Sequence, residues 1–338
     1  MKISGFTFLR NGSKLFYPII ESIQSALPLV DEFVIALGDS DPDDDTREKI
    51  EALGSDKIRI IDTVWDLEKY PRGMEHAHQT DIAKNACTGD WLLYLQGDEV
   101  LHEDDLPIIR QSCENWLNDK RVDGMLFDYL HFWGDYDHVH CSHAWYKEEI
   151  RLIRNDPEIH SFRSAQSFRR IPNFDGVSYR EKKGTKKLHC VHSGARIFHY
   201  GWVRPPIAMR KKTVYFTRNH RGEAASSSLA QSTPKDYDYG PLAPIPTYQA
   251  THPRVMSDTI RSLDWQSSLY FKETDAPETR EQHKHERFKY VVLSWIENRW
   301  LKGRQLFASE NYHPLEKFKH RPHPALTLSS VASENSSS

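Results

Sequence analysis

The first hundred residues alternate between short apolar runs and amphipathic segments, and this alternation limits the folds open to the chain. Apolar runs rich in β-branched and aromatic residues predict strands, and apolar residues three or four apart predict helices. A β-α-β-α-β-α-β order favours the α/β class, with a mostly parallel sheet flanked by helices. The expected strands are residues 2–9, 32–37, 57–65 and 91–95, and the expected helices are residues 16–26, 46–53 and 74–87.

Polar residues follow three of these predicted strands. The clearest case is WLLYL (residues 91–95), which is followed at once by Gln96, Gly97, Asp98 and Glu99. In parallel sheets ligands bind beyond the carboxyl ends of the strands, where these polar turns would meet. The other two turns are Arg10-Asn11 after the first strand and Gly38-Asp39-Ser40 after the second.

Composition excludes several classes of protein. The formal net charge of −3 over 338 residues gives no basic field, so no nucleic-acid partner is expected. Four cysteines without CxxC spacing indicate reduced thiols. The first twelve residues do not resemble a signal peptide, and no apolar run approaches the roughly 20 residues that span a bilayer. We therefore expect a cytoplasmic protein, with peripheral membrane contact left open.

The second half of the chain is less regular. Strands are expected at residues 124–133, 149–154 and 195–200, a helix at 207–219, a long loop at 221–251 and an aromatic-rich helix at 279–307. The last helix is expected to pack in a core rather than on a membrane surface. Residues after about 324 are low in complexity and are expected to be disordered. The predicted divisions are a catalytic domain at 1–204, a helical and loop-rich extension at 205–324 and a tail at 325–338.

Four motifs in sequence resemble the family 2 glycosyltransferases, which are nucleotide-sugar-dependent enzymes with the GT-A fold. The resemblance covers roughly residues 2–204. It is carried by Leu9-Arg10-Asn11-Gly12, by Gly38-Asp39-Ser40-Asp41 with Thr46, by the helix from Gly73 into Ala86-Cys87-Thr88-Gly89-Asp90-Trp91, and by Gln96-Gly97-Asp98-Glu99 in place of a D-x-D signature. It implies a GT-A-like α/β domain whose first half binds a nucleotide.

The resemblance also implies roles for single residues. Asp98 would bind a divalent cation, Mn²⁺ or Mg²⁺, that bridges the donor diphosphate. Gln96 departs from the pattern, since it offers an amide in place of the first carboxylate of D-x-D. The residues implied to contact the nucleotide are Phe8, Arg10, Asn11, Asp39, Asp81, Gln96 and Gly97.

A later stretch, RIFHYGWVRPP (residues 196–206), resembles the strand on which the family carries a histidine. His199 would join the metal or the pyrophosphate. Arg204 would contact the nucleotide, and it could neutralise the leaving diphosphate together with Arg210, Lys211 and Lys212.

An inverting transferase needs a carboxylate that acts as general base near the acceptor hydroxyl. Several acids between the two motifs are candidates, and Glu149 is the one we assign, beside Asp98, to catalysis. The candidates are Asp135, Asp137, Glu148, Glu149, Asp175 and Glu181.

The resulting hypothesis is a glycosyltransferase of glycan biosynthesis. It would move a sugar from a UDP- or GDP-sugar to a hydroxyl of a glycan or other acceptor, with inversion as is usual in the family. One alternative is a sugar nucleotidyltransferase, although FLRNGSKLF lacks the glycine-rich loop that such an enzyme needs. A second is a non-catalytic nucleotide- or glycan-binding protein on a decayed transferase scaffold, which the loss of an acid at Gln96 motivates.

Overall fold

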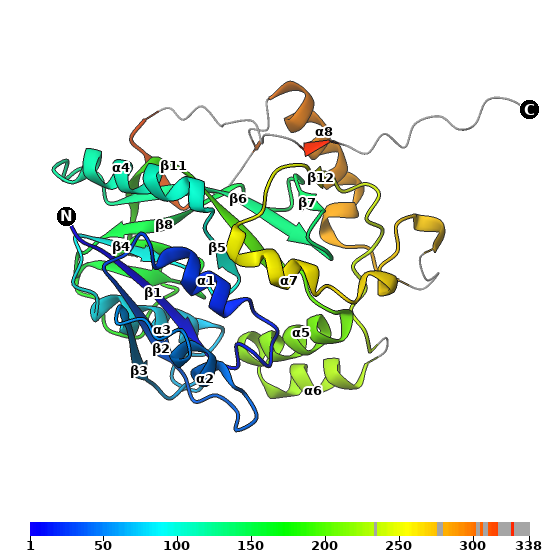
Figure 1. The fold of residues 1–338 in the computed structure, drawn as a ribbon, viewed down its shortest axis with the longest axis horizontal. Coiled ribbons are helices and arrows are strands. Elements are labelled where there is room, and N and C mark those ends of the chain that lie inside the picture. The colour runs from blue at the N-terminus through cyan, green and yellow to red at the C-terminus, as the bar shows by residue number, and fades with distance from the viewer. Residues whose placement is uncertain (233–234, 276–279, 302–304, 307–309, 317–325, 328–338) are drawn as a thin grey trace, which may run out of the picture.

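The computed structural model describes residues 1–232, 235–275, 280–301, 305–306, 310–316 and 326–327. A central sheet carries helices on its faces. The N-terminal strands lie at one end of the molecule and helix α8 lies at the other (Figure 1). The predicted α/β class, a mostly parallel sheet flanked by helices with further helices toward the C-terminus, is confirmed.

The N-terminal half of the sheet is parallel throughout, in the order β3-β2-β1-β4. The strands are β1 (Ile3–Leu9), β2 (Glu32–Leu37), β3 (Ile58–Asp62) and β4 (Trp91–Tyr94), and the connecting helices are α1 (Ile19–Ala26), α2 (Thr46–Glu51) and α3 (Met74–Asn85). All seven predicted elements are confirmed, with ends that differ by a few residues. The carboxyl ends of the strands consequently meet at one edge.

The rest of the sheet mixes directions. Strand β8 runs antiparallel to both of its neighbours, β4 and β6, while β6 and β11 are parallel. These strands are β6 (Gly124–Trp133), β8 (Glu148–Arg154), β9 (Ile159–Phe162), β10 (Ser167–Arg170) and β11 (Lys186–Trp202), with short β5 (Glu99–Val100), β7 (Val139–His140) and β13 (Tyr312–Pro314) at the side. The strand predicted at 195–200 is thus the final part of a much longer one.

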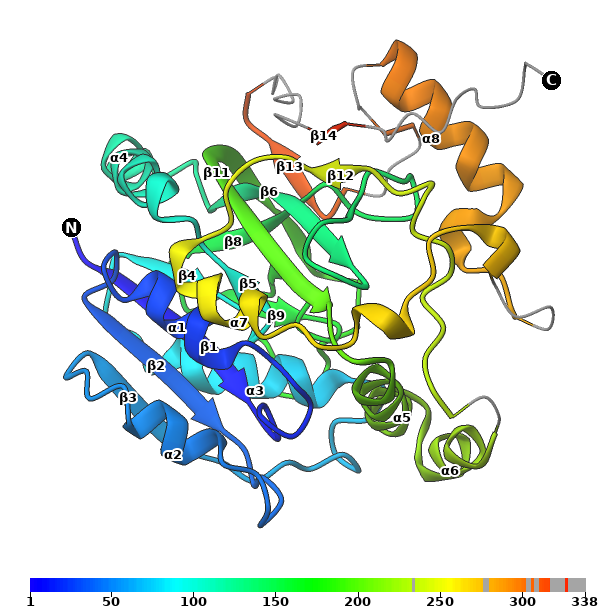
Figure 2. The same ribbon diagram turned by 45° about the vertical axis from the view of Figure 1, so that its right-hand side comes forward.

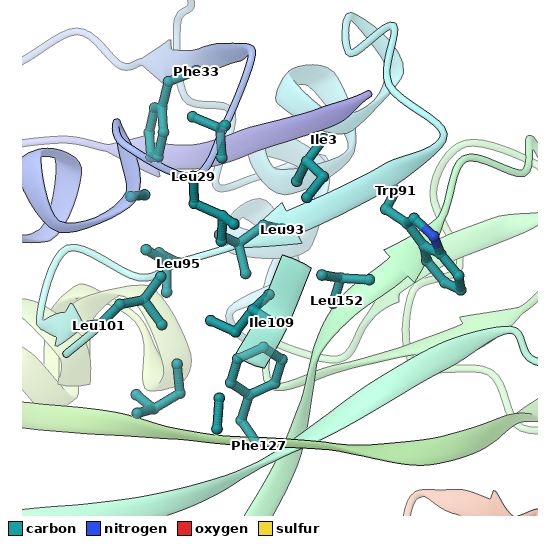
Figure 3. Packing of buried hydrophobic residues seen from close by; sticks show 14 of the residues in the cluster. Ile3, Leu29, Phe33, Trp91, Leu93, Leu95, Leu101, Ile109, Phe127 and Leu152 are labelled. Atoms are coloured by element: carbon teal, nitrogen blue, oxygen red, sulfur yellow. The ribbon is translucent and has the colours of Figure 1, made fainter. Parts of the chain in front are cut away.

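Alternating side chains of β2 build a core on each face of the sheet. Phe33 and Ile35 pack on the face covered by α1 and α4 (Leu106–Trp116), while Val34 and Ala36 pack on the face covered by α3. Figure 3 shows the first of these clusters. Because each buried large apolar side chain contributes roughly 1.5–3 kcal/mol, the two cores hold the strand ends in a fixed register.

The C-terminal part confirms two predicted helices, although the one expected at 279–307 is α-helical only over Phe288–Trp300 within the described residues, and it corrects two further expectations. The predicted basic helix is α5 (Pro206–Arg221). The loop expected at 221–251 was wrong over α6 (Glu223–Gln231), where EAASSSLAQ lacks glycine and proline. The core packing expected for the aromatic helix was wrong for α8 (Phe288–Trp300), which leaves several large apolar side chains exposed. The remaining elements are α7 (Ser257–Arg261), β12 (Thr247–Tyr248), β14 (Leu326–Thr327) and short 3₁₀ turns at Glu103–Asp105, Arg254–Met256, Gln266–Ser268, Glu273–Asp275 and Lys284–Glu286.

The expected divisions at residues 204 and 324 stay predictions. Strand β13 pairs with β11, so the chain returns to the main sheet after the extension. Most of the tail expected to be disordered lies outside the described residues. No helix in the described part of the chain has the length and apolar character needed to cross a bilayer.

Candidate nucleotide site at the strand ends

A cavity of about 260 Å³ opens at the carboxyl edge of the parallel strands, and we call it the strand-end pocket. It lies between the turns that follow β1 and β4, helix α5 and strand β8. Its lining residues are Phe8, Leu9, Arg10, Gly12, Leu15, Tyr17, Trp65, His76, Gln96, Gly97, Asp98, Tyr146, Arg151, Ser164, Gln166, Tyr215 and Phe216. Five residues predicted from the sequence therefore meet here: Phe8, Arg10, Gln96, Gly97 and Asp98.

Asp98 lies at the base of the pocket with two nitrogen groups beside it. The ammonium Nζ of Lys212 is 3.3 Å from its Oδ2, and Nε2 of His199 is 3.9 Å from its Oδ1. Burial acts to raise the pKa of Asp98, but Lys212, His199 and Arg204 together lower it below its usual value. The carboxylate is consequently ionised near neutral pH.

A second histidine fixes which ring nitrogen of His199 is free. Nε2 of His131 lies 2.8 Å from the carbonyl oxygen of Tyr146, which can only accept a hydrogen bond, so this nitrogen carries the proton. With both rings neutral, Nδ1 of His131 accepts from Nδ1–H of His199 at 3.0 Å. The lone pair of His199 Nε2 then faces Asp98. Burial lowers the pKa of His199, which favours this neutral form.

Gly201 keeps the space between these two groups open. A Cβ at this position would lie 2.6 Å from Asp98 Oδ2 and 2.6 Å from His199 Nε2, closer than real Cβ contacts. The space bounded by Asp98, His199 and Gly201 is called the cradle. A carboxylate oxygen and an unprotonated imidazole nitrogen that face the same space are suitable ligands for a divalent cation. A histidine ligand that is oriented through its other nitrogen is also the usual arrangement at metal sites. The residues present therefore fit the expected Mn²⁺ or Mg²⁺.

Arg204 is buried, and part of its guanidinium has no hydrogen-bond partner among the described residues. Its Nη1 donates to the carbonyl oxygen of Leu15 at 2.8 Å, and the guanidinium lies over the Tyr17 ring. Its Nε and Nη2 are buried and have no hydrogen-bond partner among the described residues. An unsatisfied buried cation is costly, so this group is suited to an incoming anion.

Lys212 contacts Asp98 directly, whereas the sequence indicated only that it is one of several cations near the site. It is buried among the rings of Tyr17, Trp202 and Phe216, and it donates to the carbonyl oxygen of Gly201 at 2.7 Å. Burial and then Arg204 lower its pKa to about 7. Its place in a basic run predicted charge near the site. The sequence carried no signal for its contact with Asp98, which depends on how α5 packs.

Aromatic rings form one wall of the pocket. Phe8 stacks on His76 with ring centroids 5.4 Å apart, and the Arg10 guanidinium lies 5.2 Å from the centre of Trp65. Asp39 holds this wall together, because it accepts hydrogen bonds from the backbone N–H of Trp65 and from Arg10. Planar rings of this kind stack on nucleobases.

Four predicted nucleotide contacts lie outside the lining: Asn11, Asp39, Asp81 and Arg204. Of these, Asn11 and Asp81 have structural partners elsewhere. Asn11 fixes the turn after β1: its side-chain oxygen accepts from the N–H of Asp41 at 2.7 Å, and its own N–H donates to Ser40 Oγ. Asp81 pairs with Nδ1 of His160 at 2.7 Å and accepts from the N–H of Ser161. The contact predicted for these two residues with the nucleotide stays a prediction.

Glu149 also lies outside the lining. It is buried in β8, where it accepts from Ser167 Oγ at 2.8 Å and from the N–H of Ile150. Burial raises its pKa above the usual value for glutamate. Among the described lining residues Asp98 is the only carboxylate.

The neighbouring Glu99 has a structural partner that the sequence did not indicate. It forms a fully buried ion pair with Arg151, whose Nε lies 2.7 Å from Glu99 Oε2. Tyr129 donates a further hydrogen bond to the same carboxylate. This neutral pair fixes the turn that carries Asp98, so Glu99 orients the site and brings no net charge to it.

A separate group of potential metal ligands consists of Asp128, Glu148 and His192, whose ligand atoms lie within 4.8 Å of one another. His192 Nε2 is 3.1 Å from Asp128 Oδ1. None of the three lines the strand-end pocket. This group is therefore distinct from the pair formed by Asp98 and His199.

No family model and no curated protein matches the chain. Among solved structures, glucosyl-3-phosphoglycerate synthase from Mycobacterium tuberculosis with Mn²⁺, UDP and phosphoglyceric acid matches at 19% identity and a TM-score of 0.27, over 38% of this chain and 43% of that one. Staphylococcus aureus TarS matches at 13% identity and a TM-score of 0.35, over 68% and 42%. TarS residues 1–349 with UDP match at 12% and 0.35, over 68% and 69%. The chain thus spans less than half of the first two structures, and matches at this level assign no reaction to it.

Proposed function

We propose that this protein is a divalent-metal-assisted glycosyltransferase that uses a nucleotide-sugar donor. The observation that carries the proposal is Asp98, which lines the strand-end pocket, with His199 and the cations Lys212 and Arg204 buried beside it and outside the lining. It lies at the sheet edge where the sequence motifs of the family converge. The aromatic wall beside it suits a nucleobase.

The charges of the pocket favour a diphosphate. Lys212 and Arg204 bring two positive charges when protonated and Asp98 brings one negative charge, while Glu99 and Arg151 neutralise each other. The unsatisfied N–H groups of Arg204 would gain partners from phosphate oxygens. The same two cations would stabilise the negative charge that develops on the departing nucleoside diphosphate.

The proposed cation would be held by Asp98 and His199. When bound, it would offset the charge of the diphosphate as Mn²⁺ or Mg²⁺ does in phosphate-binding sites. The chain itself orients His199 through His131 and keeps the cradle open through Gly201. Lys212 already partners Asp98, so we expect weak metal binding alone and tighter binding with a nucleotide.

The finer assignments are proposals of the same kind. We propose a UDP- or GDP-sugar as donor, a hydroxyl on a glycan or other molecule as acceptor, inversion at the transferred sugar, and Glu149 as base. All four cysteines are free, as suits a cytoplasmic protein. Glu149 could serve as a base only if the acceptor site reaches it from the pocket.

One observation supports the alternative of a non-catalytic binding protein. Asp98 is the only carboxylate among the described lining residues, and the amide of Gln96 is spent on the carbonyl oxygen of Ala165 at 3.0 Å. A decayed transferase would bind the nucleotide and not turn it over.

Thermal unfolding with UDP, GDP and ADP, each with and without Mn²⁺, tests the proposal first. A ligand that binds only the native state stabilises it by RT ln(1 + [L]/Kd), so about 2.7 kcal/mol is expected at a hundredfold excess over Kd. The binding nucleotide then identifies the donors to assay for release of nucleoside diphosphate. Stabilisation without turnover favours the binding protein. No stabilisation by any nucleoside diphosphate contradicts both.

A further inference from the structure

Two polar side chains attach helix α8 to the protein. Glu297 is fully buried, with Oε1 2.6 Å from Nδ1 of His143 and 2.7 Å from the backbone nitrogen of Leu306. Ser294, one turn earlier, accepts from the N–H of His143 at 2.9 Å. The side of the helix that meets the protein therefore carries a carboxylate and a hydroxyl.

The opposite side of α8 is apolar and exposed. Phe288 is 84% exposed, Val291 50% and Trp295 60%, and their spacing of three and then four residues places them on one face. Trp300, at the end of the helix, is 72% exposed. A helix on the surface of a protein in water normally buries its apolar stripe and exposes its charges. In α8, Tyr290, Leu293 and Ile296 are half-buried, and Phe288, Val291 and Trp295 remain exposed, so the apolar surface of the helix is only partly covered by the protein.

Positive charges border this stripe. Arg287 and Lys289 flank Phe288, and Arg299 continues the row one turn beyond Trp295; all three are exposed. Within α8 itself Glu297 is the one carboxylate, and it is buried; Glu273 and Glu281, which precede the helix, are exposed. The charge of the outer face is therefore complementary to an anionic surface.

The dimensions suit a helix that lies in a membrane interface and does not cross it. Thirteen residues give a length of about 20 Å, shorter than the roughly 30 Å hydrocarbon core. A cavity of about 600 Å³ lies beside the helix; Val291 and Trp295 line it together with Pro244 and Ile245, and charged residues such as Glu273, Arg280 and Glu286 line it as well. Figure 2 shows α8 at the periphery, far from strands β1–β3.

We propose that α8 docks this protein on a bilayer surface that contains anionic lipids, with Phe288, Val291 and Trp295 in the interface and the flanking cations at the head groups. Interfacial helices combine an apolar face with lysine and arginine in this way. A second copy of the chain fits less well, because a symmetric contact through this face would bring the same cations together. The inference is independent of the reaction proposed for the strand-end pocket.

Co-sedimentation of the full chain with vesicles tests the inference. One set of vesicles is pure phosphatidylcholine, and the other contains phosphatidylglycerol as well. We expect binding to the anionic vesicles, weakened by salt, with a blue shift of tryptophan fluorescence. The double variant Phe288→Ser/Trp295→Ser should bind at least about tenfold more weakly, since it removes two large apolar groups. Arg287→Gln/Lys289→Gln should lose about 25-fold on anionic vesicles, about fivefold per charge.

Ile207→Ser is the matched control, because Ile207 is 58% exposed on α5. It should bind vesicles as the wild type does. The inference is overturned if the wild type does not bind anionic vesicles, or if the α8 variants bind as well as Ile207→Ser. It is also overturned if light scattering shows a dimer that the α8 variants abolish while vesicle binding is absent.

Discussion

Substitution of Gly201 by alanine separates the chemistry of the site from the stability of the fold. The new Cβ would lie 2.6 Å from both Asp98 Oδ2 and His199 Nε2, so the two groups must retreat by about 0.8 Å to reach ordinary van der Waals contact. Overpacking of this kind costs about 1–3 kcal/mol. Changes that misplace metal ligands typically cost 10- to 100-fold in metal affinity. We expect Gly201→Ala to fold and to lose Mn²⁺-dependent nucleotide binding by that factor.

Calorimetric titration of the nucleoside diphosphate with and without Mn²⁺ measures this loss, and thermal unfolding measures the cost in stability. Gly184→Ala is the matched control. Gly184 has a φ of 78° and open space around it, so alanine there costs about 1–2 kcal/mol of backbone strain far from the pocket. The control should bind as the wild type does. Equal nucleotide affinity in Gly201→Ala and the wild type would refute the assignment of the cradle.

Three further substitutions test the surroundings of the cradle. Lys212→Met should weaken nucleoside diphosphate binding by tenfold or more in calorimetry, because a hydrogen bond to a charged group is worth about 1.5–3 kcal/mol; unchanged affinity would remove Lys212 from the site. Asp39→Ala should weaken nucleotide binding, and it should leave the melting temperature within a few degrees because the carboxylate is 42% exposed. Unaltered binding would contradict the proposal that the aromatic wall of the pocket holds the nucleobase. Burial raises the pKa of Glu149, so the folded protein binds the extra proton above about pH 4.5 and loses stability as the pH rises through that raised pKa. Between pH 5 and 8, the free energy of unfolding measured with denaturant should fall less for Glu149→Gln than for the wild type. An equal fall in both proteins would show that Glu149 does not cause the pH dependence. Retained turnover in this variant would exclude Glu149 as the base.

The sequence predicted the parallel half of the sheet because its signals are local. The apolar runs of β1, β2 and β4 and the polar turns after them are continuous in the chain, and parallel pairing brings the turns to one edge. Asp98 could therefore be placed at that edge from sequence. The resemblance to a known family supplied the expectation that His199 joins the metal or the pyrophosphate; the structure places its Nε2 3.9 Å from Asp98 Oδ1, and the shared metal stays a prediction.

The remaining features depend on contacts between distant segments. Glu99 meets Arg151 across 52 residues, and Lys212 meets Asp98 across 114. Neither pairing leaves a pattern in the local sequence. The same holds for the first part of β11, where charged residues such as Lys186 and Lys187 pair with β10. The exposure of the outer face of α8 was missed because its apolar residues have the spacing of a core helix, and only the packing shows which face is buried.

The most direct measurement compares the wild type with Asp98→Asn for nucleoside diphosphate release from the donor, with Mn²⁺ and with EDTA. Asp98→Asn keeps the side-chain volume but leaves the buried cations Lys212 and Arg204 without their carboxylate, so it should lower the melting temperature, and thermal unfolding must first show that the variant is folded at the assay temperature. We predict that EDTA abolishes release by the wild type and that the variant is inactive with Mn²⁺. Full activity of the wild type in EDTA, or of Asp98→Asn with Mn²⁺, would contradict the proposal that Asp98 holds the cation at the diphosphate.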